Sequence, residues 1–175
     1  MKKSQKIAYL GVFCALAFAF SYIEFLFPFQ IPGIPGVKLG LANIVVMAAL
    51  YLFSPADAAF VSAVRIVLAW LIFGNFAGFI YSLCGGALSL VLMTLVKKTD
   101  FFGEVGVSVV GGAAHNIGQI CAAVFFVGGA ALSYLPILVI SGVVTGAING
   151  AVLKLILSRL KRKNKNENFA LKSKK

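Results

Sequence analysis

Long apolar stretches, separated by short polar or glycine- and proline-rich breaks, run through the sequence. Crossing a bilayer as a helix takes roughly 20 apolar residues. The pattern therefore predicts an all-α integral membrane protein, a compact bundle of six transmembrane helices at about residues 7–29, 39–53, 58–73, 77–96, 105–127 and 132–160. The second and third stretches are nearer to roughly 16 residues, so a hairpin that does not fully cross is an open alternative.

The breaks between these stretches consist of residues that end helices or begin new ones. A run rich in proline and glycine at 28–36 predicts a structured loop after the first span. Ser54 and Pro55 break the second span, and Asp57 is expected near the start of the third. Gly74-Asn75, the segment 97–100 and Gly128-Gly129 mark the remaining turns.

Composition supports a membrane protein, because 61% of the 175 residues are hydrophobic and only 12% are charged. Soluble proteins have about a quarter of their residues charged. We expect one transmembrane domain over residues 1–160 and a basic cytoplasmic tail without regular structure over 161–175. The first span resembles a signal peptide in its basic start, but it is too long for a typical cleaved one, so we expect it to stay.

The basic residues indicate the orientation of the chain in the membrane. Of 16 lysines and arginines, 14 lie before the first span, between the fourth and fifth, or from Lys154 to the end. Cytoplasmic segments retain positive charge, so we expect both termini in the cytoplasm and a multi-pass protein of the plasma membrane. The net charge of +11 does not indicate a nucleic-acid partner, since the basic residues do not interleave along a soluble face.

Polar residues inside membrane spans are costly, so each is a candidate for function. Arg65 lies near the middle of the third span and requires a polar partner, which a structural ion pair would also provide. His115, Asn116 and Gln119 fall on one arc of the fifth span, facing a neighbouring helix or a cavity. Further candidates lie toward the outer side, and together these groups predict a substrate pocket open to the outside. They are Lys38, Asn43, Asn75 and Tyr81.

Two helices carry small residues at every fourth position, which makes a flat strip for close helix packing. In the last span the strip consists of Gly142, Gly146 and Gly150, and we interpret it as packing within the bundle. For the strip of Gly11, Ala15 and Ala19 in the first span we favour docking of a partner subunit. Asn149 is expected to make a hydrogen bond between helices rather than to contact substrate.

Several kinds of chemistry have no motif in this sequence. Five acidic residues, none adjacent to another, exclude an aspartate-rich motif for magnesium diphosphate, and there is no nucleotide-binding loop. Cys14, Cys84 and Cys121 lack the spacing of a metal site, and we expect three small buried thiols. No carboxylate lies mid-membrane, as an ion-coupled pump would require. We therefore expect no enzyme activity, no metal and no cofactor.

The stretch VKLGLANI at residues 37–44, after a proline- and glycine-rich loop and a first span with Ala15-x-x-x-Ala19, resembles the substrate-binding S components of energy-coupling-factor (ECF) vitamin transporters. The whole chain, including AAHNIGQ at residues 113–119, resembles the bacterial Gx transporter family, often labelled heptaprenyl diphosphate synthase component I. The resemblance covers about residues 7–160.

This resemblance implies a division of labour with other subunits. In S components the small-residue strip of the first span docks on a transmembrane coupling subunit, ATPases supply the energy, and substrate binds in the outer half. By this resemblance Ala15 and Ala19 would dock the partner, Lys38 and Asn43 would flank the gate, and His115, Asn116 and Gln119 would face the pocket. The ligand would be a vitamin-like, flavin or isoprenoid-related small molecule.

Two other roles stay open at this stage. Some members of the family resemble parts of flavin- or quinone-linked extracellular electron-transfer systems, and the family label itself suggests a membrane accessory subunit of isoprenoid or quinone metabolism. A purely structural assembly factor is a further alternative. A bound small molecule favours capture, whereas a stably associated soluble synthase and an empty pocket favour the accessory role.

Overall fold

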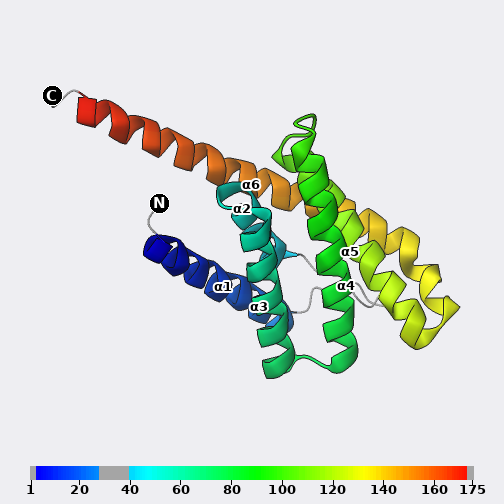
Figure 1. Ribbon diagram of the computed structural model, residues 1–175. Coiled ribbons are helices and arrows are strands. Elements are labelled where there is room, and N and C mark those ends of the chain that lie inside the picture. Colours follow the sequence, from blue (N-terminus) through cyan, green and yellow to red (C-terminus); the bar gives the residue numbers. More distant parts are fainter. Residues whose placement is uncertain (1–2, 28–39, 173–175) are drawn as a thin grey trace.

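The computed structural model describes residues 3–27 and 40–172, and in these ranges the chain consists of helices joined by short turns, with no strand. Six α-helices and one short 3-10 helix follow one another along the chain (Figure 1). Their bounds are α1 Lys3–Leu26, α2 Leu41–Leu52, α3 Pro55–Phe73, α4 Phe76–Lys98, α5 Glu104–Val127, η1 Gly129–Tyr134 and α6 Leu135–Lys172. The prediction of an all-helical membrane bundle is confirmed.

Five of the six α-helices are long and apolar enough to cross a membrane, and α2 is the exception. The 19 residues of α3 suffice for a span, so the third predicted stretch is a full one. By contrast α2 has only 12 residues and is about 18 Å long, short of the roughly 30 Å hydrocarbon core. The sequence left open a hairpin of the second and third stretches that does not fully cross the membrane. Of these two helices, only α2 is too short to cross.

The depth at which α2 begins follows from its pairing with α3. These two helices are antiparallel and joined by a tight turn at Ser54, so residues equally far from the turn lie at the same depth. Nη2 of Arg65 donates a hydrogen bond to Oδ1 of Asn43 at 2.9 Å, and both residues lie about 15 Å along their helices from that turn. The N-terminus of α2 therefore lies near the middle of α3.

Close contact between α5 and α6 results from the glycine strip of the last span. A Cβ atom on Gly146 would lie 2.7 Å from the carbonyl oxygen of Ser108, and one on Gly112 would lie 2.2 Å from that of Gly142. No side chain fits at such separations, so the backbones of α5 and α6 touch directly. The interpretation of Gly142, Gly146 and Gly150 as a packing strip within the bundle is confirmed.

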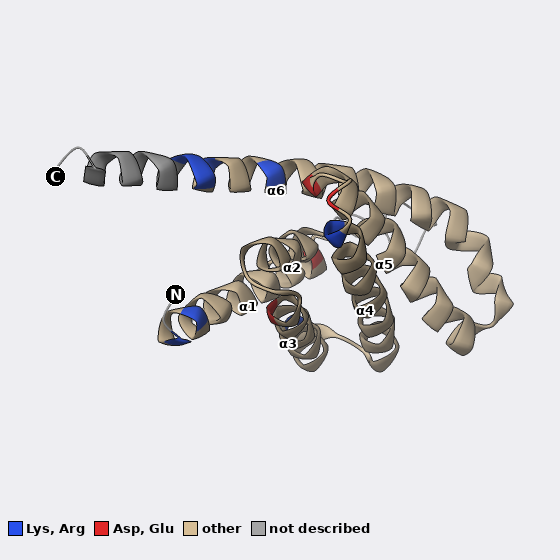
Figure 2. Cartoon of the chain, turned by 45° about the horizontal axis from the view of Figure 1, so that its top comes forward, with Lys and Arg blue, Asp and Glu red and all other residues tan. Residues whose placement is uncertain are grey.

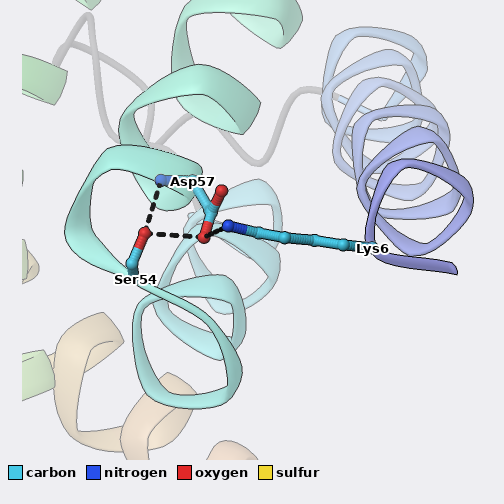
Figure 3. Close-up of polar contacts among 3 residues, drawn as sticks. All are labelled: Lys6, Ser54 and Asp57. Carbon is cyan, nitrogen blue, oxygen red and sulfur yellow. Dashed lines mark hydrogen bonds and ion pairs between the residues drawn. The ribbon is translucent and has the colours of Figure 1, made fainter. Parts of the chain in front are cut away.

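The turn between α2 and α3 is tied to the start of α1 (Figure 3). Ser54 caps α3, its Oγ accepting from the backbone N–H of Asp57 at 3.2 Å and donating to Oδ2 of Asp57 at 2.6 Å. The same carboxylate oxygen lies 2.8 Å from Nζ of Lys6. At the same end of the bundle Nζ of Lys97, on α4, donates to the carbonyl of Leu50 at 2.7 Å. We call this end, with Lys6 and Lys97, the basic end.

The last helix is much longer than a membrane span. Its 38 residues make a helix about 57 Å long, and its C-terminal part extends away from the other helices with lysines and arginines along it (Figure 2). The helix continues to Lys172, where the sequence analysis expected a tail without regular structure from residue 161. Lysine, arginine and glutamate are good helix formers, which accounts for the continuation.

Burial of the cysteines differs from the prediction. Cys14 is buried among core residues of α1, α2 and α3, as expected. Cys84 and Cys121 are exposed on the outer surface of the bundle, so the prediction that all three thiols are buried is wrong for these two. The apolar surroundings that suggested burial in protein are the lipid-facing surfaces of α4 and α5, because in a membrane protein lipid and core are equally apolar.

Candidate functional site

A cavity of about 500 Å³ lies inside the bundle, and all six α-helices contribute to its wall. It reaches the end of the bundle opposite the basic end, where Gly74 and Asn75 form the α3–α4 turn. Inward it extends to Met47 of α2 and Met93 of α4. Sites for small molecules in proteins usually have volumes of about 300–1,000 Å³, so this cavity has the size of a site for one small molecule.

Three side chains hold the N-terminal end of α2 at the cavity wall. The backbone N–H of Leu41 donates to Oε1 of Glu24, on α1, at 2.7 Å. Nδ2 of Asn149, on α6, donates to the carbonyl of Gly40 at 3.1 Å, and Arg65 of α3 bonds Asn43. Gly40 has φ 72°, a left-handed conformation that favours glycine. Contacts from α1, α3 and α6 thus fix the start of a helix in mid-bundle.

Arg65 is the cation that the described part of the cavity wall provides. Its side chain is half-buried, and its Nε–H is buried without a hydrogen-bond acceptor among the described residues. Glu24 is the carboxylate of the described wall that attracts this guanidinium, but it accepts a hydrogen bond from Leu41 and makes no salt bridge with Arg65. A guanidinium with an unused donor in a low-dielectric wall is a strong attractant for an anion or a further acceptor.

The polar residues of α5 lie on the cavity wall, with distinct partners. Nδ2 of Asn116 donates to the carbonyl of Leu138 on α6 and lies 3.4 Å from Oγ of Ser141. Asn116 is therefore engaged in joining α5 to α6. His115 and Gln119 lie where α5 passes Gly85 of α4, since a Cβ atom on Gly85 would come within 2.8 Å of the Gln119 side chain. The glycine leaves space for these two side chains at the cavity.

Aromatic rings form the part of the wall nearest the α3–α4 turn. The rings of Trp70 and Phe79 have centroids 4.9 Å apart, and those of Phe25 and Phe73 are stacked at 4.7 Å. All four residues line the cavity. The cavity therefore has an aromatic section toward the α3–α4 turn and a polar section around Arg65, Asn43 and His115. An amphipathic small molecule matches such a division.

Most of the predicted binding residues line this one cavity. They are Asn43, Arg65, Asn75, His115, Asn116 and Gln119. Asn75 has a structural role as well, since its Oδ1 accepts from the N–H of Gly78 at 2.7 Å and caps α4. Asn149 makes the expected hydrogen bond between helices and also lines the cavity. Lys38 lies outside the described residues.

Tyr81 is not brought to the cavity. The residues of α4 that line it recur at helical spacing, at Gly78, Ser82, Ser89 and Met93, and Tyr81 lies one residue off this line. Its ring packs instead edge-on against Phe126 of α5, with centroids 5.9 Å apart. Depth in the span alone suggested Tyr81, and the helical register places it on a different face.

The sequence analysis missed several wall residues. The hydroxyl groups of Ser82, Ser89, Ser108 and Thr145 line the cavity, as do the rings of Trp70 and Phe79. Ser89 and Ser108 share a helical register with predicted residues. Ser108, for example, lies seven residues before His115, so the helical period of 3.6 residues would have found it. The aromatic residues carried no such signal, because a membrane span consists predominantly of apolar residues.

The strip of Gly11, Ala15 and Ala19 lies on the outer surface of α1. All three residues are exposed, and a Cβ atom on Gly11 would meet nothing within 4 Å. The opposite side of α1, with Cys14 and Ala17, packs on α2 and α3. No described part of the chain covers the strip. Among the described residues no group of three or more possible ligands for a metal ion occurs either.

Comparison with known proteins gives one match. A model of the family described as heptaprenyl diphosphate synthase component I matches residues 13–156, which include all six cavity-lining candidates named above. Neither a search of curated proteins nor a search of solved structures found a match.

Proposed function

This chain belongs to the heptaprenyl diphosphate synthase component I family, and within that family we propose that it is a non-enzymatic substrate-capture subunit, similar to an S component of an ECF transporter. It binds a vitamin-like, flavin or isoprenoid-related molecule in the cavity, from the side opposite the basic end. A separate transmembrane coupling subunit and ATPases energise uptake. The carrying observation is the cavity of about 500 Å³, which reaches that side and is lined by all six α-helices.

Two further features support this proposal. The strip of Gly11, Ala15 and Ala19 has no cover in the described chain, so it is available to a partner helix. The chain has no nucleotide-binding motif, and a capture subunit leaves nucleotide hydrolysis to its partners.

The second candidate is a membrane accessory subunit of isoprenoid or quinone metabolism. The description of the family favours it. In this role the exposed strip of α1 would anchor a synthase or an electron-transfer complex, and the cavity would stay empty. The two roles therefore differ in what copurifies with the chain and in what occupies the cavity.

The docking experiment uses Ala15→Leu and Ala19→Leu in the full chain, extracted gently from its native membrane. Both positions are exposed, so leucine fits without disturbing the bundle but prevents close approach of a partner helix. We expect loss of a coupling subunit and ATPases that copurify with the unmodified chain, with the molecules bound in the cavity retained. Ala63→Leu, the same change at an exposed position of α3, is the control and should keep the partners.

Two results would count against the capture role. Equal association of all three variants with the coupling subunit would remove α1 as the docking surface. Copurification of a soluble prenyl synthase in place of a coupling subunit, with no small molecule bound, would favour the accessory role.

A further inference from the structure

The cavity wall has one described carboxylate and one described cation, and the two differ in how fully they are hydrogen-bonded. Glu24 and Arg65 both line it, and the Glu24 carboxylate has a donor at 2.7 Å in the Leu41 amide. Arg65 has only the neutral acceptor Asn43, and its Nε–H is buried without an acceptor among the described residues. The Glu24 carboxylate attracts this guanidinium but makes no salt bridge with it, and a buried donor left unsatisfied inside a membrane bundle is costly. The group with unused capacity at this site is therefore positive.

The start of α2 adds to the positive character of this region. Gly40 and Asn43 line the cavity, and Gly40 provides no side-chain cap for the helix. A helix N-terminus carries a partial positive charge, which stabilises nearby anions. Interrupted helices that end at mid-membrane use this effect on the anionic groups of transported molecules. Glu24 occupies the Leu41 amide of this terminus, and Arg65 lies beside Asn43, two residues further along α2.

The aromatic section limits the rest of the ligand. Trp70 lies five residues after Arg65 on α3 and lines the same cavity, with Phe79 beside it. Flat rings bind well against such a pair, offset or edge-on. On α5, His115 and Gln119 line the cavity with groups that hydrogen-bond to neutral polar atoms.

We propose that the ligand of this cavity is an aromatic carboxylate: its carboxylate binds the guanidinium of Arg65, and its ring lies in the section lined by Trp70 and Phe79. The unused Nε–H of Arg65 offers a donor to such a carboxylate. Guanidinium and carboxylate match in geometry and form paired, charge-assisted hydrogen bonds. This proposal deepens the capture role, on which it rests for the ligand's entry into the cell, although binding itself is measured without any partner.

The chain contains its own reporter for the test, because Trp70 is the one tryptophan in the sequence and lines the cavity. The purified full chain in lipid nanodiscs is titrated with 4-nitrobenzoate and, separately, with the neutral 4-nitrobenzamide, both of which quench tryptophan. The Trp70→Phe variant supplies the optical baseline. We expect saturable quenching by both, with the acid binding at least about tenfold more tightly than the amide.

A variant that keeps Arg65 removes the preference for the acid. Asn43→Asp places a carboxylate of nearly the same shape where Oδ1 now accepts from Arg65, so the guanidinium gains an internal ion pair and the bundle should fold. We expect its affinity for 4-nitrobenzoate to fall at least about tenfold, to that of the amide. Gln5→Glu is the control: it makes the same amide-to-carboxylate change at an exposed residue of α1 outside the cavity wall and should keep the preference.

Three results would overturn this proposal. They are equal binding of acid and amide, absence of saturable quenching by either compound, and equal behaviour of Asn43→Asp and Gln5→Glu. Failure of the capture role has a different signature. If Asn43→Asp loses the acid preference but no coupling subunit associates with the chain, the anion site stands and the transport role falls. If the subunit associates and the amide binds as well as the acid, the transport role stands and the anion site falls.

Discussion

At the scale of single residues, several polar side chains in this bundle close helix ends or face the cavity. Ser54 caps α3 and Asn75 caps α4, each with a side-chain oxygen that accepts from a backbone N–H. Such caps typically contribute about 1 kcal/mol. Asn43 and Asn149 have both roles, since they hold the start of α2 and also line the cavity. Polar groups that are costly in a membrane are thus used where backbone groups need partners.

The Lys6–Asp57 ion pair yields the prediction at this scale. Lys6 is 43% exposed in its side chain and Asp57 only 11%, so the pair is partly screened by water. A cycle of Lys6→Gln, Asp57→Asn and the double variant should give a coupling energy of about 0.5–1 kcal/mol, measured by reversible unfolding in mixed micelles. Lys3→Gln, an exposed lysine one turn earlier, is the control. Strictly additive single effects would show that the pair contributes nothing.

At the scale of helices, glycine decides which pairs pack backbone to backbone. Gly85 and Gly118 bring α4 and α5 together: a Cβ atom on Gly118 would lie 2.7 Å from the carbonyl of Cys84. Gly112 and Gly142 do the same for α5 and α6. The first helix has small residues at the same spacing, but on its outer surface, where nothing in the described chain meets Gly11. Small residues at every fourth position therefore pack helices together inside the bundle, whereas on α1 the same spacing leaves an uncovered outer strip.

Paired alanine substitutions test this distinction. In Gly112→Ala the new Cβ would lie 2.2 Å from the Gly142 carbonyl, and we expect a loss of about 1–3 kcal/mol in stability because two backbones must separate. In Gly11→Ala nothing clashes, and the higher helix propensity of alanine should leave the chain equally stable or more stable by up to about 1 kcal/mol. Unfolding in mixed micelles measures both. A similar loss in the two variants would contradict the assignment.

At the scale of the whole molecule, charge and cavity lie at opposite ends. Lys6 and Lys97 lie at the basic end, and the C-terminal part of α6 adds exposed basic residues including Arg159 and Arg162. The cavity reaches the other end, at the α3–α4 turn. Because positive segments stay on the cytoplasmic side, this arrangement predicts a cavity that faces the outside.

Thiol labelling in intact cells tests that orientation. In a background with Cys14, Cys84 and Cys121 replaced by serine, Asn75→Cys lies at the turn near the cavity and Thr99→Cys at the turn after α4. We expect a membrane-impermeant maleimide to label Asn75→Cys in intact cells and Thr99→Cys only after the cells are opened. The reverse pattern would place the cavity on the cytoplasmic side and would exclude capture from outside.

The sequence predicted most of this fold because membrane helices have strong signals. Apolar length found the spans, and Ser54-Pro55 and Gly74-Asn75 located the turns correctly. The short second stretch was recognised, but whether it and the third cross was left open, because apolar composition does not show where a helix begins; α2 has 12 residues and α3 has 19. Helical spacing placed His115, Asn116 and Gln119 on the cavity wall, whereas Tyr81 was assigned by depth alone and lies elsewhere.

Other features depended on tertiary contacts that no local pattern encodes. The bond from Asn149 to Gly40 joins residues 109 positions apart, and the pair Lys6–Asp57 joins the first helix to the third. Which side of a helix faces lipid was also hidden, because lipid and protein interior are equally apolar. For this reason Cys84 and Cys121 were expected inside and lie outside.

The most direct test of the central claim is mass spectrometry of the small molecules that the gently extracted chain carries. Ala69→Phe fills the cavity from α3, and Ala63→Phe makes the same change at an exposed position of that helix. We predict one small molecule bound to the unmodified chain and to Ala63→Phe, and none bound to Ala69→Phe. Two results would contradict the claim that this cavity binds the ligand. They are an unmodified chain without a bound molecule, and the same amount of bound molecule on the unmodified chain and both variants.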